Sequence, residues 1–337
     1  MKQLYTALAA LCLSLTSQAQ LNVLYVVDTD IDSAGNANLT TALTNSGHNF
    51  TTFDAATMVA SPTFATDMSG IDLVIWYTGS NGVDLQLWGG MDTINQELYQ
   101  YLNSGGALWV IGNDFLYDLY DAPPVYFNST DQAAVLFGID SYDVQSYGND
   151  SNEGVPQMDL ASGHTITDQT PLTFVWSTLW WGDGGTPAAG TQVVYEMGPG
   201  TYTLSGYPSA TYFDNGTYQV LAYYFNAAML NTQGAVDEAV KDVLDYFQTV
   251  GIKEEASKIR FHAYPNPVRD QLTITWESQT HVQQIRLIDN TGRLVIDKTC
   301  SPGTVSQTLD MSALPAGVYH VSVSDTDGNQ SGHHIVR

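Results

Sequence analysis

The segment ALWVIGNDFLYDLYD, residues 107–121, is typical of an apolar strand, a glycine-containing turn and a helix. Several α/β enzymes carry a catalytic nucleophile on such a turn, because the tight turn exposes one side chain at the carboxyl end of the sheet. Here that residue is Asp114, which follows Gly112 and Asn113. An aspartate in this position could act as a nucleophile, bind a ligand or cap the following helix.

A catalytic aspartate needs a partner that activates water and donors that stabilise an oxyanion. Residues 21–250 contain two histidines, His48 and His164. His48 follows Gly47 at the expected end of a helix, which is typical of a surface loop. His164 lies in an expected loop and could approach Asp114 as a catalytic partner. A histidine that forms only structural hydrogen bonds fits the same position.

Acidic residues follow the first apolar strand, residues 21–28, in the segment DTDIDSAGNANL. Its carboxylates Asp28, Asp30 and Asp32 are hard oxygen ligands of the kind that calcium prefers. The segment is not an EF-hand loop, because Ser33 replaces the required glycine and Leu39 replaces the bidentate glutamate. Two interpretations remain open: a calcium site at these aspartates, or solvated loop acids that cap helices. No other cofactor is expected.

The segment WSTLWWGDGG, residues 176–185, combines aromatic side chains with an acid. Trp176, Trp180 and Trp181 lie close in sequence to Asp183. Exposed tryptophan faces can stack on sugar rings, whereas buried ones would close the edge of a hydrophobic core. Both interpretations fit the sequence.

The first 20 residues have the pattern of a secretory signal peptide. An apolar run from Leu4 to Leu15 is followed by a small-residue exit at residues 17–19. The run is too short to span a membrane, and no other run reaches that length, so we expect no transmembrane segment. The mature chain then keeps one cysteine, Cys300, and can form no intrachain disulfide.

The charge of the chain is strongly acidic and unevenly distributed. The formal net charge is −25, and Lys241 is the only basic residue between residues 21 and 250. Such a surface repels the phosphate backbone, which excludes nucleic acid as a partner. The acidity fits either divalent-cation binding or a solvated surface suited to a salty exterior.

Apolar strands alternate with helical patterns over residues 21–250. The segments 21–28, 71–79 and 107–112 are almost uniformly apolar, as strands covered on both faces tend to be. We therefore predict an α/β domain with a flavodoxin-like, doubly wound parallel sheet, closed by an amphipathic helix at 234–251. Residues 140–190 are rich in Gly, Asp, Ser and Trp and are predicted to form long loops.

A different organisation begins after residue 250. Residues 251–261 are charged and polar, which is typical of a linker. Residues 262–337 contain short alternating strands separated by turn residues, which predicts a small all-β immunoglobulin-like sandwich.

The second region resembles the type A sorting domain of type IX secretion. The resemblance rests on AYPNPVRDQLTI, IRLIDNTGRLV, LDMSALPAGVYHVSV and the basic end of HHIVR. It covers residues 262–337 and implies export by the type IX secretion machinery, followed by release or by attachment at the outer-membrane cell surface. The residues that carry the sorting motif are Tyr264, Pro265, Asn266, Pro267, Gly317 and Tyr319.

The first region resembles class I glutamine amidotransferase-like domains. The similar segments are LNVLYVVDTD, DLVIWYTG, LYQYLNSGGALWVIGND, SGHTITDQTPLTF and GTYQVLAYYFNAAMLN. The family's nucleophile turn reads Gly-x-Cys-x-Gly, and here Asp114 stands at the cysteine position and Leu116 at the second glycine. Residues 21–250 contain no cysteine, which excludes a thiol amidotransferase.

We therefore predict a secreted or cell-surface protein whose first domain, residues 21–250, is non-catalytic and acts in binding or structure. The candidate ligand is a glycan, a peptide or a divalent ion. The alternative is an extracellular hydrolase that uses Asp114 with His164. The candidate ligand-binding residues are Thr78, Asn81, Asn113, Trp180, Trp181 and Asp183.

Overall fold

The computed structural model describes residues 20–90, 93–163, 165–250, 261–276, 281–289, 293–325 and 330–337. The chain divides into two compact units, one up to Gly251 and the other from Ile252 onwards. Most of the expected signal peptide (residues 1–19) and of the expected linker (residues 251–260) lies outside the described residues. Each unit is described by itself.

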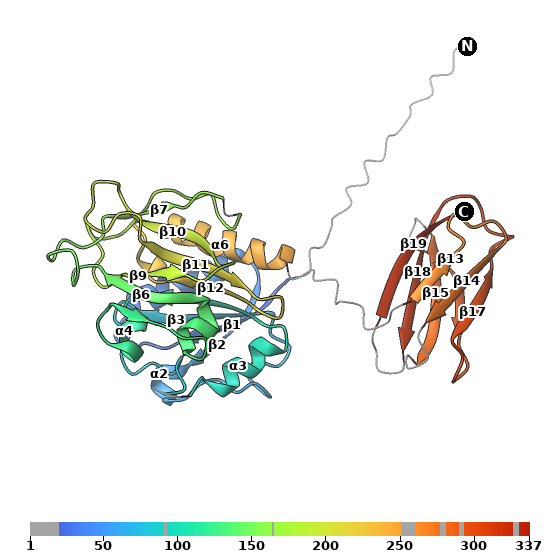
Figure 1. Cartoon of the computed structure of the whole chain (residues 1–337), viewed down its shortest axis with the longest axis horizontal. Coiled ribbons are helices and arrows are strands. Elements are labelled where there is room, and N and C mark those ends of the chain that lie inside the picture. The colour runs from blue at the N-terminus through green and yellow to red at the C-terminus, as the bar shows by residue number, and fades with distance from the viewer. Residues whose placement is uncertain are drawn as a thin grey trace, which may run out of the picture. The chain divides into compact units, whose positions relative to one another are not determined.

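The first unit is built on a nine-stranded sheet in the order β2-β1-β3-β4-β12-β11-β10-β7-β8 (Figure 1). The five strands from β2 to β12 are parallel, and the remaining four continue the sheet as antiparallel strands. The nine strands are β1 (Asn22–Val27), β2 (Asn49–Asp54), β3 (Leu73–Gly79), β4 (Ala107–Gly112), β7 (Gln157–Leu160), β8 (Leu172–Thr173), β10 (Gln192–Gly198), β11 (Pro208–Asp214) and β12 (Gln219–Tyr223).

A second, three-stranded antiparallel sheet in the order β5-β6-β9 belongs to the same unit. Its strands are β5 (Val125–Tyr126), β6 (Ile139–Gln145) and β9 (Asp183–Pro187). The helices are α1 (Ser33–Ser46), α2 (Ala55–Met58), α3 (Gln96–Asn103), α4 (Phe115–Tyr120), α5 (Gln132–Phe137), the 3-10 helix η1 (Ala227–Met229) and α6 (Gln233–Val250).

The predicted fold class was wrong. Strands make up 37% of the structure and helices 20%, so the protein is mostly β, with large mixed and antiparallel sheets. A doubly wound flavodoxin-like sheet would be parallel throughout, but here only the part from β2 to β12 is parallel. The region 140–190, expected as long loops, contributes β6, β7, β8 and β9. Flavodoxin-like core plus immunoglobulin-like domain is therefore not the architecture of this chain.

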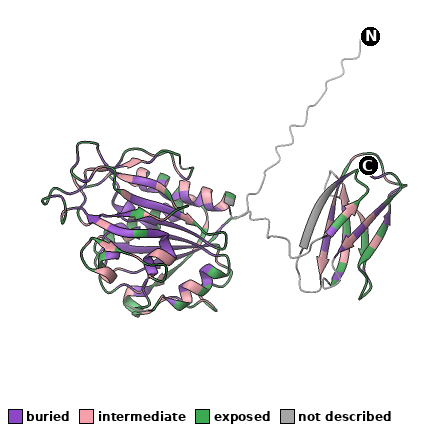
Figure 2. Ribbon diagram, viewed as in Figure 1, coloured by how far each residue is buried: buried purple, intermediate pink, exposed green. Residues whose placement is uncertain are grey.

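The parallel strands separate two hydrophobic cores. Along β1, Val23 and Tyr25 enter the core shared with α1 and α6, while Leu24 and Val26 enter the core shared with α3, α4 and α5. This two-sided burial explains why β1, β3 and β4 read as apolar throughout. Buried residues concentrate in these strands in Figure 2.

The second unit is a β-sandwich of two antiparallel sheets, β13-β14-β17 and β16-β15-β18-β19. Its strands are β13 (Phe261–Tyr264), β14 (Gln271–Trp276), β15 (Val282–Asp289), β16 (Leu294–Thr299), β17 (Ser306–Asp310), β18 (Val318–Asp325) and β19 (Gln330–Val336). Alternating side chains of β14, such as Leu272 and Ile274, fill the core between the sheets.

The turn at the end of β4 depends on a glycine. Gly112 has φ +155°, and a Cβ there would lie 2.0 Å from Thr78 Oγ1 and 2.8 Å from the Gly79 carbonyl oxygen. Close approach of β4 to the end of β3 therefore requires the absence of a side chain at this position.

We expect Gly112→Ala to lower the free energy of unfolding by about 3 kcal/mol, because the methyl group overlaps buried backbone. Gly190→Ala is the matched control, since Gly190 also has positive φ (+97°) but open space around it, and we expect it to cost about 1 kcal/mol. Calorimetric unfolding of the two variants measures both values. Equal losses of stability in the two variants would show that the positive φ alone, and not the contact with Thr78 and Gly79, requires glycine at residue 112.

Candidate functional site

The carboxyl ends of the parallel strands bring polar residues together at one edge of the large sheet. Asp28 follows β1, Thr78 lies near the end of β3, and Asn113 follows β4. Asn226 follows β12, which is the next strand in the sheet. All four are almost completely buried, and Asp28 also lines a cleft at this edge.

Asn226 and Asp32 form the centre of a hydrogen-bonded network at this edge. The Asn226 amide donates to Asp32 Oδ2 at 2.8 Å, and Tyr77 and Ser80 donate to the same oxygen at 2.8 and 2.6 Å. Asp32 Oδ1 accepts the Gly35 N–H at 2.9 Å and so caps α1. Asp32 is thus saturated with donors from its own protein.

Asn113 extends the network to β4. Its Oδ1 accepts the Asn226 N–H at 2.7 Å, and its Nδ2 donates to the Trp180 carbonyl at 3.0 Å. Thr78 donates to the Ile111 carbonyl at 3.3 Å. Asn113 and Thr78, which we expected to contact a ligand, form these hydrogen bonds within the protein.

Asp114 occupies a strained turn, as the strand–turn–helix pattern predicts. Its φ and ψ are +64° and +7°, the left-handed region that few non-glycine residues adopt. It precedes α4, but its side chain makes no capping hydrogen bond. Its carboxylate instead accepts the Gln145 amide at 2.5 Å. Strain of this kind clusters at functional sites, where surrounding contacts maintain it.

A second buried carboxylate shares the same donor. Gln145 Nε2 also lies 3.2 Å from Asp183 Oδ1, which accepts the Tyr142 hydroxyl at 2.8 Å. The Asp183 side chain has no exposed surface, and its other oxygen accepts the Leu116 N–H at 3.3 Å. Asp114 and Asp183 are therefore close neighbours in the protein interior, bridged by one neutral amide.

Burial raises the pKa of both carboxyl groups. Desolvation raises the pKa of Asp114 to about 6, although the hydrogen bond from Gln145 lowers this pKa in part. Desolvation and the nearby Asp114 charge raise the pKa of Asp183 well above its usual range. Asp28, whose carboxylate accepts from Trp76 Nε1 and the Leu87 N–H, has its pKa raised to about 6, again mainly by desolvation.

His164 lies outside the described residues, so its pairing with Asp114 stays a prediction. β7 runs antiparallel to β4. The described residues that follow Leu160 therefore leave the sheet at the end of the strands opposite to Asp114. Thr167, a few residues later, donates to Asp242 of α6 at 2.7 Å.

The three aspartates proposed as calcium ligands have separate surroundings. Asp28 faces Trp76 and Leu87, Asp32 faces Asn226, and Asp30 is exposed. Among the described residues, no group of three or more His, Cys, Asp or Glu side chains is arranged to hold a metal ion. Calcium binding stays a prediction.

An aromatic loop that contains Trp180 and Trp181 is hydrogen-bonded to Asn113 and Asp114. Trp180 is 49% exposed and packs on Tyr147 in a tilted arrangement, with ring centroids 4.4 Å apart and planes 34° apart. Trp181 meets the same Tyr147 edge-on at 5.0 Å. The loop is attached to β4 because the Asp114 N–H donates to the Trp181 carbonyl at 3.0 Å.

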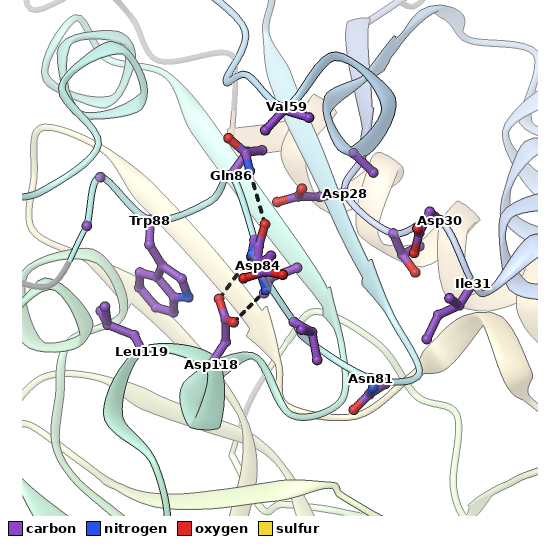
Figure 3. A pocket seen from close by; sticks show the side chains of 16 residues that line it. Asp28, Asp30, Ile31, Val59, Asn81, Asp84, Gln86, Trp88, Asp118 and Leu119 are labelled. Atoms are coloured by element: carbon purple, nitrogen blue, oxygen red, sulfur yellow. Dashed lines mark hydrogen bonds between the residues drawn. The ribbon is translucent and has the colours of Figure 1, made fainter.

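A cleft of about 970 Å³ opens at the same edge of the sheet, between the segments that follow β1 and β3 (Figure 3). Asn81 lines this cleft, as do Asp28 and Asp30. Asp32, Asn113 and Asp183 are not among its lining residues. The predicted ligand-binding residues thus separate into a buried network, an aromatic loop and an acidic cleft.

The sequence analysis missed Asn226, Gln145 and Tyr142. Asn226 follows an apolar strand, so the strand-end argument applied to β1, β3 and β4 could have found it. Gln145 and Tyr142 carried no such signal, because β6 lies in a region without clear periodicity.

The sorting-motif residues hold the C-terminal strand of the sandwich. Asn266 Oδ1 accepts the Val336 N–H at 2.9 Å, and Gly317 exchanges two backbone hydrogen bonds with Arg337 at 2.8 and 2.9 Å. Tyr319 is buried, and its hydroxyl donates to the Pro315 carbonyl at 2.6 Å. Tyr264 lies on β13 and is half exposed, and Pro265 and Pro267 follow it in the bend before β14.

Residues 262–337 match the secretion system C-terminal sorting domain family. The protein is therefore secreted or held at the outer-membrane cell surface. In the described part of the chain, no helix is both long and apolar enough to cross a membrane. The match does not extend to the first unit, and the resemblance to glutamine amidotransferases found no support.

A search of curated proteins returned no match. Among solved structures, the chain is similar to the cytoplasmic protein STM1381 from Salmonella typhimurium LT2 (15% identity, 67% of this chain and 99% of that chain, TM-score 0.43). It is also similar to the exo-β-1,4-mannosidase Op5Man5 from Opitutaceae bacterium strain TAV5 (14% identity, 70% and 36%, TM-score 0.37). These TM-scores are below 0.5, so neither similarity carries an argument.

We expect Asp114→Asn to stabilise the protein at neutral pH. The folded Asp114 carboxyl has a pKa of about 6 against 3.8 for an unperturbed group, so its contribution is fully present below pH 3.8 and is lost as the pH rises through about 6. An asparagine keeps an oxygen for Gln145 and tolerates positive φ. The variant should therefore unfold at higher temperature than the wild type at pH 7.5, with a smaller difference at pH 4.5.

The exposed Asp140→Asn on β6 is the control, because it removes the same charge without touching the buried network. An Asp114→Asn variant that is less stable than the wild type at pH 7.5 would show that the ionised carboxylate is a favourable partner of Gln145.

Proposed function

We propose that the first unit is an extracellular glycan-binding domain. The single observation that carries this proposal is the Trp180–Tyr147 pair, two aromatic rings in tilted contact of which Trp180 is half exposed to solvent, on a secreted protein. Aromatic rings bind sugars because the apolar C–H face of a pyranose packs on them, while a neighbouring polar group orients the hydroxyls.

The loop that presents Tyr147 is held in one conformation by Asp150. The carboxylate of Asp150 accepts the backbone N–H groups of Tyr147, Glu153 and Gly154 at 2.8–3.0 Å and the Tyr202 hydroxyl at 2.6 Å. A site that is rigid before binding loses less conformational entropy when a ligand arrives. This supports a binding role for the loop.

The opposite side of the site is equally fixed. The Trp180 carbonyl is bound by Asn113 and the Trp181 carbonyl by the Asp114 N–H. A Cβ on Gly154 would lie 2.5 Å from Trp180 Cδ1, so the indole also packs on backbone. Exposed polar side chains, Asn152 and Glu153, lie in the same loop and supply hydrogen-bonding groups for sugar hydroxyls.

We expect Trp180→Ala to weaken binding to a soluble polysaccharide about tenfold, because loss of a ring that stacks on the sugar costs about 1–2 kcal/mol. Affinity electrophoresis through gels that contain a panel of neutral polysaccharides measures the change. Tyr126→Ala is the matched control, since Tyr126 is 79% exposed on β5 but has no stacking partner among the described aromatic contacts. Retention that is the same for both variants would remove the proposal.

A second function, hydrolysis of a bound glycan by Asp114, is favoured by three features of this residue. Asp114 has a raised pKa, a strained turn and a place directly beneath the aromatic loop. A carboxyl group with a pKa near 6 can act as a general acid at mildly acidic pH. The Gln145 and Asp183 groups would position it, while Asp183 itself is too deeply buried to reach a substrate.

Asp114→Asn separates the two functions. If the domain only binds, the variant should keep polysaccharide retention and show the same absence of released reducing ends as the wild type. If the domain hydrolyses, the wild type should release reducing ends with an activity that falls as the pH rises through about 6, and Asp114→Asn should lose that activity at least a hundredfold while it remains folded.

A further inference from the structure

The cleft in Figure 3 lies at the ends of β1 and β3, which are neighbours in the sheet. The connections that follow these two strands run in opposite directions along the sheet. After β1 the chain passes through α1 to the edge strand β2, and after β3 it passes through α3 to β4 on the other side. Parallel sheets bind ligands in the crevice at such a switch of direction. The volume of about 970 Å³ is at the upper end of the range, roughly 300–1,000 Å³, of small-ligand sites.

The rim of the cleft is apolar and unusually exposed. Ile31, Val59 and Val83 line it and are 65%, 72% and 58% exposed. They come from three separate segments, after β1, after α2 and after β3. Isolated exposed aliphatic residues are common, but several that gather around one cleft mark a surface that a partner covers.

The interior of the cleft carries one sign of charge. Asp28, Asp30, Asp84 and Asp118 line it, and no basic residue does among the described lining residues. In Figure 3, Asp28, Asp84 and Asp118 occupy the middle of the cleft, with Val59 and Ile31 at its margins. The Asp118 carboxylate accepts the N–H groups of Asp84 and Leu85 at 2.8 and 3.1 Å, which fixes the segment that carries Asp84.

These features indicate which class of ligand fits the cleft. A bare divalent ion is disfavoured, because the described carboxylates do not converge on a common point. A sugar would need an accessible aromatic face, and Trp88 in the cleft is only 8% exposed. We propose that the cleft binds an extended peptide segment in which lysine or arginine alternates with aliphatic residues. The aliphatic side chains cover the rim, and the cationic groups enter between the carboxylates.

The experiment uses the secreted chain and two peptides that carry fluorescein on the N-terminal amine, Val-Lys-Leu-Arg-Val-amide and Val-Glu-Leu-Glu-Val-amide. Fluorescence anisotropy should show binding of the basic peptide only, and binding should weaken as salt rises from 50 to 500 mM, because salt screens the charge pairs. The double variant D30N/D84N should weaken it about fivefold or more, because two partly exposed charge pairs are lost. Val83→Ser should weaken it about twofold through the lost apolar contact.

The matched control is D140N/E238Q, which removes two charges from exposed positions that do not line the cleft. It guards against general attraction of a basic peptide to a protein with net charge −25. Losses of equal size in D30N/D84N and D140N/E238Q would overturn the proposal, and so would equal binding of the two peptides. Binding of spermidine that competes fully with the peptide and does not respond to Val83→Ser would assign the cleft to small amines instead.

This proposal stands apart from glycan binding at Trp180. Trp180→Ala should leave peptide affinity unchanged, and D30N/D84N should leave polysaccharide retention unchanged, because the aromatic loop and the cleft share no lining residue. The failure of one proposal therefore leaves the other intact. Thermal melts of each variant check that the unit remains folded.

Discussion

The Asn226 side chain joins the ends of the central strands. Through one amide and its own N–H it connects the loop after β1, the end of β3, the turn after β4 and the 3-10 helix after β12. No charged partner could replace it easily, because the same buried position must both donate to a carboxylate and accept a backbone N–H. The turn that carries Asp114 and the loop that carries Trp180 are held at fixed positions because this network is complete.

The first unit also shows how an acidic chain can bury carboxylates without buried cations. Asp32 and Asp150 are stabilised by several neutral donors each, from hydroxyl, amide and backbone N–H groups. Asp114 and Asp183 receive fewer donors for two neighbouring groups, so their protonation is favoured instead. The two pairs therefore differ in the number of neutral donors that surround each carboxylate.

The sequence predicted the parts of the structure that depend on local pattern. The strands β1, β3 and β4 and the turn at Asp114 follow from apolar runs and turn residues. The antiparallel extension of the sheet did not, because strands such as β9, with the sequence DGGTP, show neither alternation nor an apolar run. Asp183 lies on that strand, so its position next to Asp114 could not be predicted from the sequence either. Exposure of Trp180 could only be posed as an alternative, since a tryptophan-rich loop fits a core and a surface equally well.

The scarcity of basic residues in the first unit has a consequence for its survival outside the cell. An extracellular protease that cleaves after lysine or arginine finds one candidate bond between residues 21 and 250, after Lys241. That bond lies within the 18-residue helix α6, where Lys241 pairs with Asp245. Proteases bind their substrates as extended strands, so this helix would have to unwind before cleavage. The scarcity of lysine and arginine thus leaves proteases of this specificity a single candidate bond in this region, independently of what the domain binds.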